Sequence, residues 1–216
     1  MKGGRGVFIT FEGVEGCGKS TQLRRVAERL SAVGMAVREL REPGGTAAGE
    51  AIRGILLDRG HAGLDARAEL LLYEASRAQL VAEVIDPALQ AGEVVLCDRF
   101  YDSTTAYQGF ARGLPAKEIE RLNAFATGGT VPDLTIVLDI ETDEGLQRAT
   151  GSAVGADRLE SEALSFHERV REGFLAIARA EPERALVIPA DGSRDVVAER
   201  VWTALVASGV LRGMME

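Results

Sequence analysis

Short runs of consecutive apolar residues alternate along the chain with stretches in which apolar residues recur every three or four positions. The continuous runs are typical of buried strands, and the periodic stretches are typical of amphipathic helices. Five strands are expected, at residues 6–13, 35–40, 93–98, 132–140 and 185–190. Helices are expected at residues 19–33, 52–56, 66–91 (with a bend near Asp86 and Pro87), 114–125, 142–148, 166–177 and 197–205.

Strands that are apolar throughout, each followed by a helix, predict an α/β fold with a parallel sheet and helices on both of its faces. The length of 216 residues fits a single domain over residues 1–216 with a small mobile appendage. Ligands of such sheets bind beyond the carboxyl ends of the strands. We therefore expect the functional residues in the loops that follow the strands, at 12–19, 41–46, 98–109 and 139–158.

The segment after the first strand reads "FEGVEGCGKST", in which Gly13, Gly18, Lys19 and Ser20 match the pattern G-x-x-x-x-G-K-[ST]. Glycines at this spacing let backbone N–H groups surround a phosphate, the lysine reaches the β- and γ-phosphates, and the hydroxyl ligates Mg²⁺. A glycine-rich turn could match by chance, but a strand precedes this one and a helix follows it. The residues expected to bind ATP here are Gly13, Val14, Glu15, Gly16, Cys17, Gly18, Lys19, Ser20 and Thr21.

Features that the sequence lacks argue against two classes of nucleotide-binding protein. A GTPase usually carries an N-K-x-D signature, yet the only asparagine, Asn123, is followed by alanine. Motor and helicase ATPases are larger than this chain. A small phosphotransferase remains, and such an enzyme needs a second site for the acceptor.

Candidate acceptor residues follow the third strand and lie on the long helix. Asp98 leaves a strand end near the phosphate loop, where it could order Mg²⁺, and Arg99 could grip an acceptor phosphate. A surface ion pair is the commoner meaning of Asp-Arg. Tyr73 and Arg77 stand four residues apart on one helix face, where they could stack on a base and bond its edge. The alternative is a core tyrosine and a solvated arginine.

The motifs "FEGVEGCGKST", "REPGGT", "YEASRAQ", "DRFYDSTTAYQG", "VPDLTIVLD" and "DRLE", in this order, resemble the thymidylate kinase family over nearly the whole chain. The resemblance implies the P-loop NTPase fold and transfer of the γ-phosphoryl group of ATP to dTMP, giving dTDP and ADP for dTTP biosynthesis. It implies Mg²⁺ as cofactor, with Ser20, Asp98 and Glu15 as the metal-site residues. Another nucleoside monophosphate or deoxynucleoside kinase, or a non-catalytic nucleotide-binding module, are the alternatives.

The resemblance also implies roles for single residues. Glu15 matches a carboxylate near the 3′-hydroxyl of dTMP, Arg99 the arginine that grips its phosphate, and Arg77 the arginine at the thymine edge. Tyr107 matches a tyrosine that crowds the 2′ position. The full set implied to bind dTMP is Glu15, Glu42, Pro43, Tyr73, Arg77, Arg99, Ser103, Tyr107 and Gln108. Tyr73 stands where phenylalanine is usual, and "DRF" replaces the commoner "DRY".

Phosphoryl transfer depends on alignment and on neutralising charge, so the position of the arginines matters. Part of the family carries an arginine where this chain has Gly16, and the resemblance is to the branch with its arginine in the lid. The lid is expected at about residues 148–160, with Arg158 stabilising the transition state and Arg148 contacting ATP. An ordinary loop with a salt-bridged Arg158 is the alternative. The predicted catalytic set is Lys19, Arg99, Arg158 and Glu15.

Composition limits the partners. A net charge of −8 disfavours general nucleic-acid binding, and no apolar run approaches the ~20 residues of a membrane span. With no secretory pattern at the N-terminus and only two cysteines, Cys17 and Cys97, a cytoplasmic protein is expected. Both cysteines are interpreted as small buried residues rather than a redox switch. "ELLLYE" and the resemblance indicate a homodimer; a helix crowded between sheet and loop is the alternative.

Overall fold

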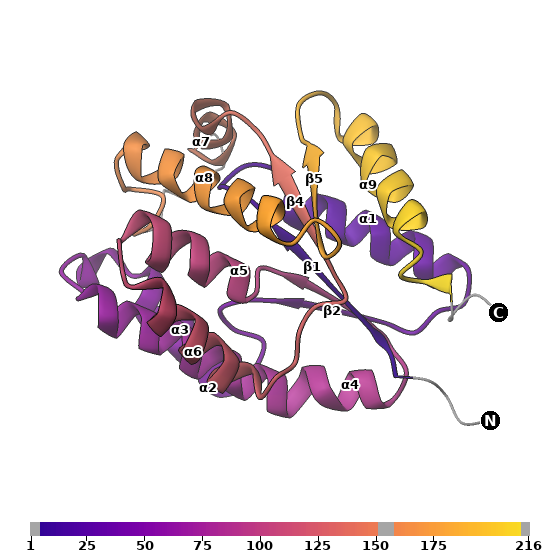
Figure 1. Cartoon of the computed structure of the whole chain (residues 1–216), viewed down its shortest axis with the longest axis horizontal. Helices are drawn as coiled ribbons and strands as arrows, with labels where there is room; N and C mark the ends of the chain where they lie inside the picture. Colours follow the sequence, from indigo (N-terminus) through magenta and orange to yellow (C-terminus); the bar gives the residue numbers. More distant parts are fainter. Residues whose placement is uncertain (1–4, 151–157, 213–216) are drawn as a thin grey trace.

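The computed structural model describes residues 5–150 and 158–212 of the chain. Five parallel strands form one sheet in the order β2-β3-β1-β4-β5 (Figure 1). This arrangement confirms the prediction of a five-stranded parallel sheet. The strands are β1 Val7–Glu12, β2 Val37–Arg41, β3 Val94–Asp98, β4 Leu134–Asp139 and β5 Ala185–Pro189.

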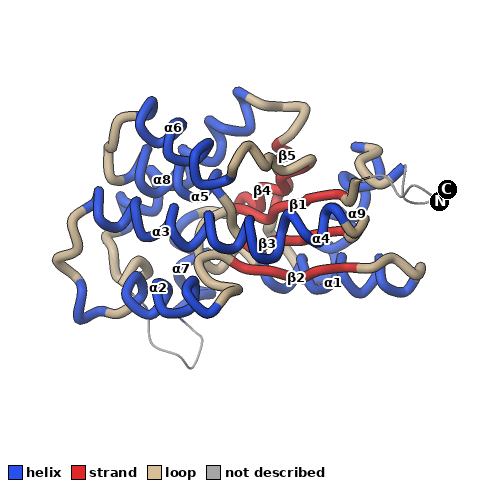
Figure 2. Tube along the Cα trace, turned by 90° about the horizontal axis from the view of Figure 1, so that it is seen from below, coloured by secondary structure: helices blue, strands red, loops and turns tan. Residues whose placement is uncertain are grey.

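Helices cover both faces of the sheet, as Figure 2 shows. The α-helices are α1 Lys19–Ala32, α2 Ala47–Leu57, α3 Ala66–Leu80, α4 Asp86–Gln90, α5 Tyr101–Thr104, α6 Ala116–Thr127, α7 Thr142–Thr150, α8 Leu164–Ala180 and α9 Arg194–Ser208. Three further helical segments are the 3₁₀ turn η1 Arg59–His61 and the π-type segments η2 Val81–Ile85 and η3 Thr105–Ala111.

Alternate residues of β1 serve the two faces. Ile9 and Phe11 belong to the core cluster that includes Val26 and Leu30 of α1. Phe8 belongs to a second cluster with residues of η2, α4 and β3. All of β1 is buried, which explains why its sequence shows no polar alternation.

The long helix expected over 66–91 is interrupted where a bend was predicted. α3 ends at Leu80, the π-type segment η2 follows, and α4 begins at Asp86 with Pro87 in its first turn. Proline lacks an N–H for the helical ladder and crowds the preceding turn, which accounts for the disturbance before it.

The expectation of a loop over 98–109 is wrong, because α5 and η3 make residues 101–111 helical. The segment "YDSTTAYQG" is rich in residues that prefer other conformations, so propensity does not reveal the helix. Packing against α8 supplies the missing stabilisation. A Cβ added to Gly173 of α8 would lie 2.9 Å from Cα of Ala106, which shows how closely these two segments approach.

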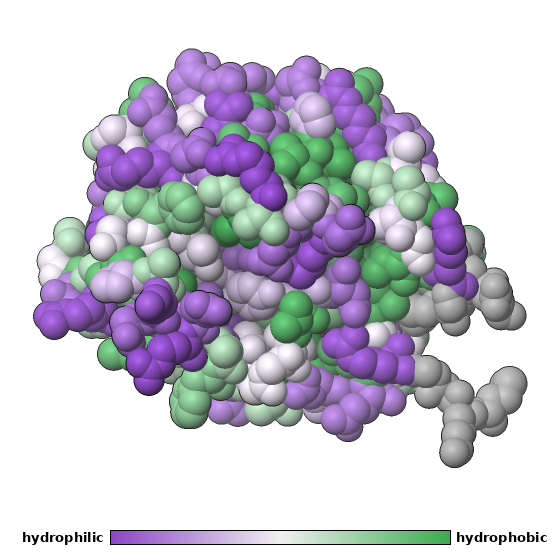
Figure 3. Space-filling view, in the orientation of Figure 1, coloured by the Kyte–Doolittle hydropathy of each residue, from purple (hydrophilic) through white to green (hydrophobic). Residues whose placement is uncertain are grey.

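The middle of the predicted lid, residues 151–157, lies outside the described residues. On its near side α7 extends to Thr150, slightly beyond the expected end at Arg148. None of the helices in the described part of the chain has the length and apolar character needed to cross a bilayer. The face shown in Figure 3 is largely hydrophilic, with hydrophobic residues in separate patches.

Candidate active site

The phosphate loop joins β1 to α1 and is pressed against two neighbouring segments. A Cβ on Gly13 would lie 2.4 Å from the carbonyl oxygen of Leu138, at the end of β4. A Cβ on Gly16 would lie 1.9 Å from the carbonyl oxygen of Gly145 in α7. Both glycines also have positive φ angles, 134° and 69°. Only glycine fits either position, so the loop's path depends on them.

Two loop side chains carry the chemistry that the motif predicts. The Lys19 ammonium group is buried and donates to the carbonyl oxygens of Gly13 and Val14, at 3.1 and 2.9 Å. The Ser20 hydroxyl donates to a carboxylate oxygen of Asp98 at the end of β3. The structure thus places the Lys19 ammonium group inside the loop, and the Ser20 hydroxyl and the Asp98 carboxylate beside it.

Two cavities adjoin the loop from different directions and share Gly16, Lys19 and Ser20. The first, of about 280 Å³, is lined by Glu15, Gly16, Lys19, Ser20, Arg41, Glu42, Pro43, Arg53, Leu57, Tyr73, Asp98, Arg99, Ser103, Thr104, Tyr107, Gln108, Leu159 and Glu160. The second, of about 640 Å³, is lined by Gly16, Cys17, Gly18, Lys19, Ser20, Thr21, Gln22, Arg148, Ala190, Gly192, Ser193, Arg194 and Val197. We call them the acceptor cavity and the donor cavity.

Most of the residues predicted for dTMP line the acceptor cavity: Glu15, Glu42, Pro43, Tyr73, Arg99, Ser103, Tyr107 and Gln108. Arg148, predicted for ATP, lines the donor cavity together with the loop residues 16–21. Gly13 and Val14 line neither cavity, although their carbonyl oxygens hold Lys19.

Arg99 connects the loop to the helix that follows β3. Its guanidinium group donates to Glu15 Oε1 at 3.0 Å, to the carbonyl oxygen of Gly13 at 3.2 Å and to the hydroxyls of Ser103 and Tyr107. The backbone of Arg99 is left-handed, with φ 72°, a conformation that is uncommon outside glycine. Such strain is held by its surroundings and is found most often at functional sites.

Glu15 is buried and receives donors on both carboxylate oxygens. Burial by itself raises its pKa, but the His167 hydrogen bond, the charges of Arg99 and Lys19 and the Tyr107 hydroxyl together lower that pKa well below its usual range. Glu15 is therefore ionised at neutral pH. The site keeps a fixed anion between two cations.

The pKa of Glu12, at the end of β1, is shifted in the opposite direction. Burial, helped by the charge of Asp102, raises the pKa of Glu12 to about 8 despite the opposing effect of Arg99. Its carboxyl group accepts from the Phe100 N–H at 2.7 Å and from the Ser103 hydroxyl at 2.6 Å. Glu12 lies beneath the acceptor cavity rather than in it.

Arg77 does not line the acceptor cavity, although it was predicted at the thymine edge. It is buried and donates to Glu42 and Glu74, with contacts of 2.8 and 2.9 Å. Burial raises the pKa of Glu42 to about 7 in spite of the Arg77 charge, and Glu74 adds to the rise. Arg77 thus supports Glu42, which does line the cavity.

Arg158 is also buried and lies against α2 and α3. Its Nε donates to the carbonyl oxygen of Leu56 at 2.8 Å, and a terminal nitrogen lies 2.5 Å from a carboxylate oxygen of Glu69. The same Glu69 accepts from Gln108 at 2.7 Å. Arg158 lines neither cavity in this structure, so its predicted contact with the transferred phosphate is not formed here.

Several residues that line the acceptor cavity were not predicted as site residues from the sequence: Arg41, Arg53, Leu57, Thr104, Leu159 and Glu160. Arg53, from α2, is the most informative, because it adds a cation to the acceptor cavity and donates to the Pro43 carbonyl oxygen at 2.9 Å. The chain has 25 lysines and arginines, and no motif marks this one. Its place about two helical turns beyond the "REPGGT" turn was the available signal.

The described residues hold no cluster of three His, Cys, Asp or Glu side chains that could bind a metal ion. Ser20 and Asp98 nevertheless offer two oxygen ligands beside the phosphate loop. Mg²⁺ keeps several waters and takes further ligands from substrate phosphates, so a pair of this kind fits it. Both cysteines are free and buried, as expected.

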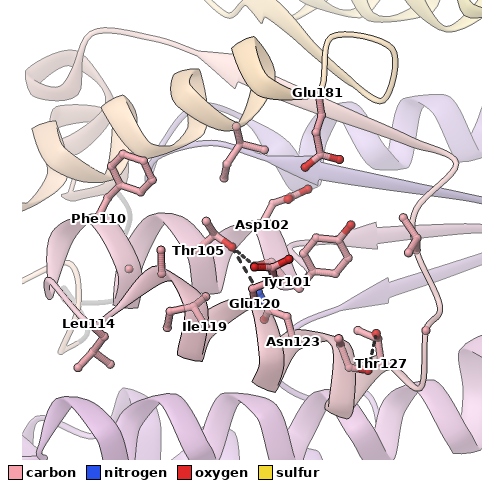
Figure 4. Close-up of a pocket in the computed structure, with 16 residues that line it drawn as sticks. Tyr101, Asp102, Thr105, Phe110, Leu114, Ile119, Glu120, Asn123, Thr127 and Glu181 are labelled. Atoms are coloured by element: carbon pink, nitrogen blue, oxygen red, sulfur yellow. Dashed lines mark hydrogen bonds between the residues drawn. The ribbon is translucent and has the colours of Figure 1, made fainter.

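A third cavity, of about 630 Å³, lies between α5, η3, α6 and α8, and Figure 4 shows its labelled lining residues. It shares no lining residue with the acceptor cavity. The two cavities use different residues of one helical segment, with Thr105 and Phe110 on one side and Thr104 and Tyr107 on the other.

Comparison with known proteins agrees with this geometry. The family model described as thymidylate kinase matches residues 11–201. The chain belongs to the thymidylate kinase family. It is 55% identical over 202 residues to a thymidylate kinase of Solidesulfovibrio magneticus, covering 91% of this chain and 97% of that one. It is 49% identical to a thymidylate kinase of Deinococcus radiodurans, with coverages of 95% and 98%.

A solved structure agrees as well. The crystal structure of thymidylate kinase from Ehrlichia chaffeensis superposes with a TM-score of 0.78 at 34% identity, covering 93% of this chain and 99% of that one. Membership of this family makes the chain a nucleotide kinase, a phosphotransferase with the P-loop NTPase fold.

Proposed function

We propose that the chain transfers the γ-phosphoryl group of ATP to dTMP, giving ADP and dTDP for dTTP synthesis. The observation that carries this proposal is the pair of cavities that meet at Gly16, Lys19 and Ser20. A donor nucleotide in one and an acceptor in the other would bring their phosphates together over the same lysine. The relatives are thymidylate kinases by name, and this name supplies the acceptor.

In this proposal the acceptor cavity binds dTMP. Arg99 grips the acceptor phosphate, since its guanidinium group lines the cavity and is held in place by Glu15 and the Gly13 carbonyl oxygen, and Arg53 lies in the same cavity. Tyr73 stacks on the base, and Tyr107 restricts the 2′ position of the sugar. Glu15 accepts from the 3′-hydroxyl, because its ionised carboxylate borders the cavity.

Mg²⁺ would be held by Ser20, with Asp98 ordering it and its waters and Glu15 near the same shell. When bound it would neutralise charge on the phosphates. Lys19 would bind phosphate after leaving the carbonyl oxygens of the loop. Arg148 would bind ATP from the edge of the donor cavity.

Arg158 is proposed to stabilise the transferred group after its ion pair with Glu69 opens. The lid of residues about 148–160 remains a prediction. Arg158→Ala should lose most of kcat while the KM for dTMP changes little, because an arginine of this kind is worth ~10³-fold or more in rate. A near-normal kcat would assign Arg158 to structure alone and leave charge stabilisation to cations that already line the cavities.

We also propose a cytoplasmic homodimer that contacts through α3 and α6. Leu71 of α3 is 55% exposed and Phe125 of α6 is 85% exposed. The two helices pack together, so both apolar side chains lie on neighbouring elements. Sedimentation should give a dimer for the wild type and a monomer for the double variant Leu71→Glu, Phe125→Glu. A monomeric wild type would contradict this.

The decisive test is a coupled assay of ADP release with Mg-ATP and dTMP, dUMP, dCMP, dGMP or dAMP as acceptor. A preference for dTMP supports the proposal. Turnover with another monophosphate would keep the phosphotransferase and overturn the acceptor. ATP binding without turnover on any of the five would instead support a binding module.

A further inference from the structure

His167 is a polar side chain on an otherwise apolar helix face. It lies on α8, its ring has 0% exposed surface, and its neighbours Phe166, Val170 and Phe174 belong to the core. The Phe166 ring meets it edge-on at 5.5 Å. No motif singled out this histidine, which is one of two in the chain.

The His167 ring reaches the phosphate loop. Its Nδ1 lies 3.2 Å from Oε2 of Glu15, while Oε1 of the same carboxylate takes the donors of Arg99 and Tyr107. An ionised carboxylate only accepts hydrogen bonds, so Nδ1 carries the proton and donates. His167 is therefore the donor that fixes the second oxygen of Glu15.

This arrangement has a cost that packing alone would not incur. Among the described residues, Nε2 of His167 has no hydrogen-bond partner. A buried polar atom without a partner destabilises the fold, and a phenylalanine would fill the same space without it. Within the described part of the chain, the polar contact that the ring makes is with Glu15. The geometry therefore indicates a role at the site.

We propose that His167 is a positioning residue for phosphoryl transfer, whose Nδ1–H holds the Glu15 carboxylate toward the 3′-hydroxyl of the acceptor nucleotide. The proposal rests on the proposed role of Glu15. With both oxygens bonded, the carboxylate plane is fixed in the cavity wall. Without His167, Oε2 loses its donor and the carboxylate turns about its last bond.

The test compares dTMP with 3′-deoxy-dTMP as acceptors. His167→Phe keeps the ring and removes the donor, whereas His167→Asn keeps a donor near the Nδ1 position. His167→Gln keeps a donor of the same kind but places it near the Nε2 position. His61→Phe is the matched control, because His61 is an exposed histidine in η1 that lines neither cavity.

We expect His167→Phe to lower kcat/KM for dTMP by about tenfold, the lower end of what a hydrogen bond to a charged group is worth. The value for 3′-deoxy-dTMP should change less than about twofold, since that substrate lacks the hydroxyl that Glu15 would hold. His167→Asn should restore most of the preference for dTMP, His167→Gln should not, and His61→Phe should match the wild type.

An equal loss with both acceptors, or an unchanged preference in His167→Phe, would overturn the proposal. The Glu15→Gln variant tests the role of Glu15 separately from the role of His167. If it removes the preference and His167→Phe does not, Glu15 keeps its role and His167 does not position it. If the wild type shows no preference, the role of Glu15 fails and this proposal with it. Should His167→Phe not fold, equal behaviour of the Asn and Gln variants would overturn it.

Discussion

Glu12 offers a quantitative test of the electrostatics beneath the acceptor cavity. Its side chain is fully buried at the end of β1, and burial raises its pKa from an ordinary value of 4.5 to about 8. An acid whose pKa is raised on folding binds protons more tightly in the native state. Its contribution to stability is complete below about pH 4.5 and is lost progressively as the pH rises toward 8.

The loss amounts to about 1.4 kcal/mol for each pH unit inside that window. Glu12→Gln removes the titration while keeping the size of the side chain. Its amide oxygen still accepts from the Phe100 N–H, and the Ser103 hydroxyl must turn to accept from the amide. That rearrangement costs stability at every pH, so the informative quantity is the change between two pH values.

The assay is urea unfolding of the wild type and Glu12→Gln at about pH 5 and about pH 7. The difference in unfolding free energy between the two proteins should move in favour of the variant by about 3 kcal/mol from the lower to the higher pH. Glu42, whose pKa is raised to about 7, titrates in both proteins and cancels. A difference that stays constant, or moves toward the wild type, would refute the assignment of a protonated Glu12.

Three further changes follow from the site. Gly16→Ala places a Cβ where backbone already lies, so calorimetry should show ATP affinity at least about tenfold weaker; unchanged affinity would mean the loop is not pinned. Arg77→Met leaves Glu42 and Glu74 buried without their partner, so urea unfolding should show a stability lower by about 3–5 kcal/mol. A loss of less than about 1 kcal/mol would contradict this. Arg148→Ala should raise the KM for ATP about tenfold and leave the KM for dTMP unchanged in steady-state kinetics; a rise in both would place Arg148 elsewhere.

The strands and the phosphate loop were predictable because each is coded locally. β1, β3 and β4 are largely apolar runs without polar alternation, and such runs are typical of strands buried on both faces. The loop motif fixes its own backbone path through Gly13 and Gly18, both of which have positive φ angles, and it brings Lys19 and Ser20 with it. These features need no knowledge of what packs against them beyond the sheet.

The helix after β3 could not be predicted in the same way. Its stability comes from contact with α8 some sixty residues later, where Gly173 lets Ala106 approach. The positions of Arg77 and Arg158 also depend on partners that are distant in sequence, Glu42 for the first and Glu69 for the second. A motif indicates which residue type a site uses. The carboxylate that pairs with that residue within the protein is known only from the fold.

The close packing of Gly16 leaves no room for a side-chain cation at this position of the phosphate loop. A Cβ at this position would meet the carbonyl oxygen of Gly145 at 1.9 Å, so no arginine can occupy it unless α7 moves. The loop and α7 therefore constrain each other. Their close approach excludes a side chain at Gly16, and it also places Arg148, near the end of α7, in the wall of the donor cavity. Arg53 and Arg99 line the other cavity, across Lys19 from Arg148. In the proposed reaction, the transferred phosphate would then meet the cations of α7, α2 and the β3 end together with Arg158, and the loop would contribute backbone N–H groups and Lys19.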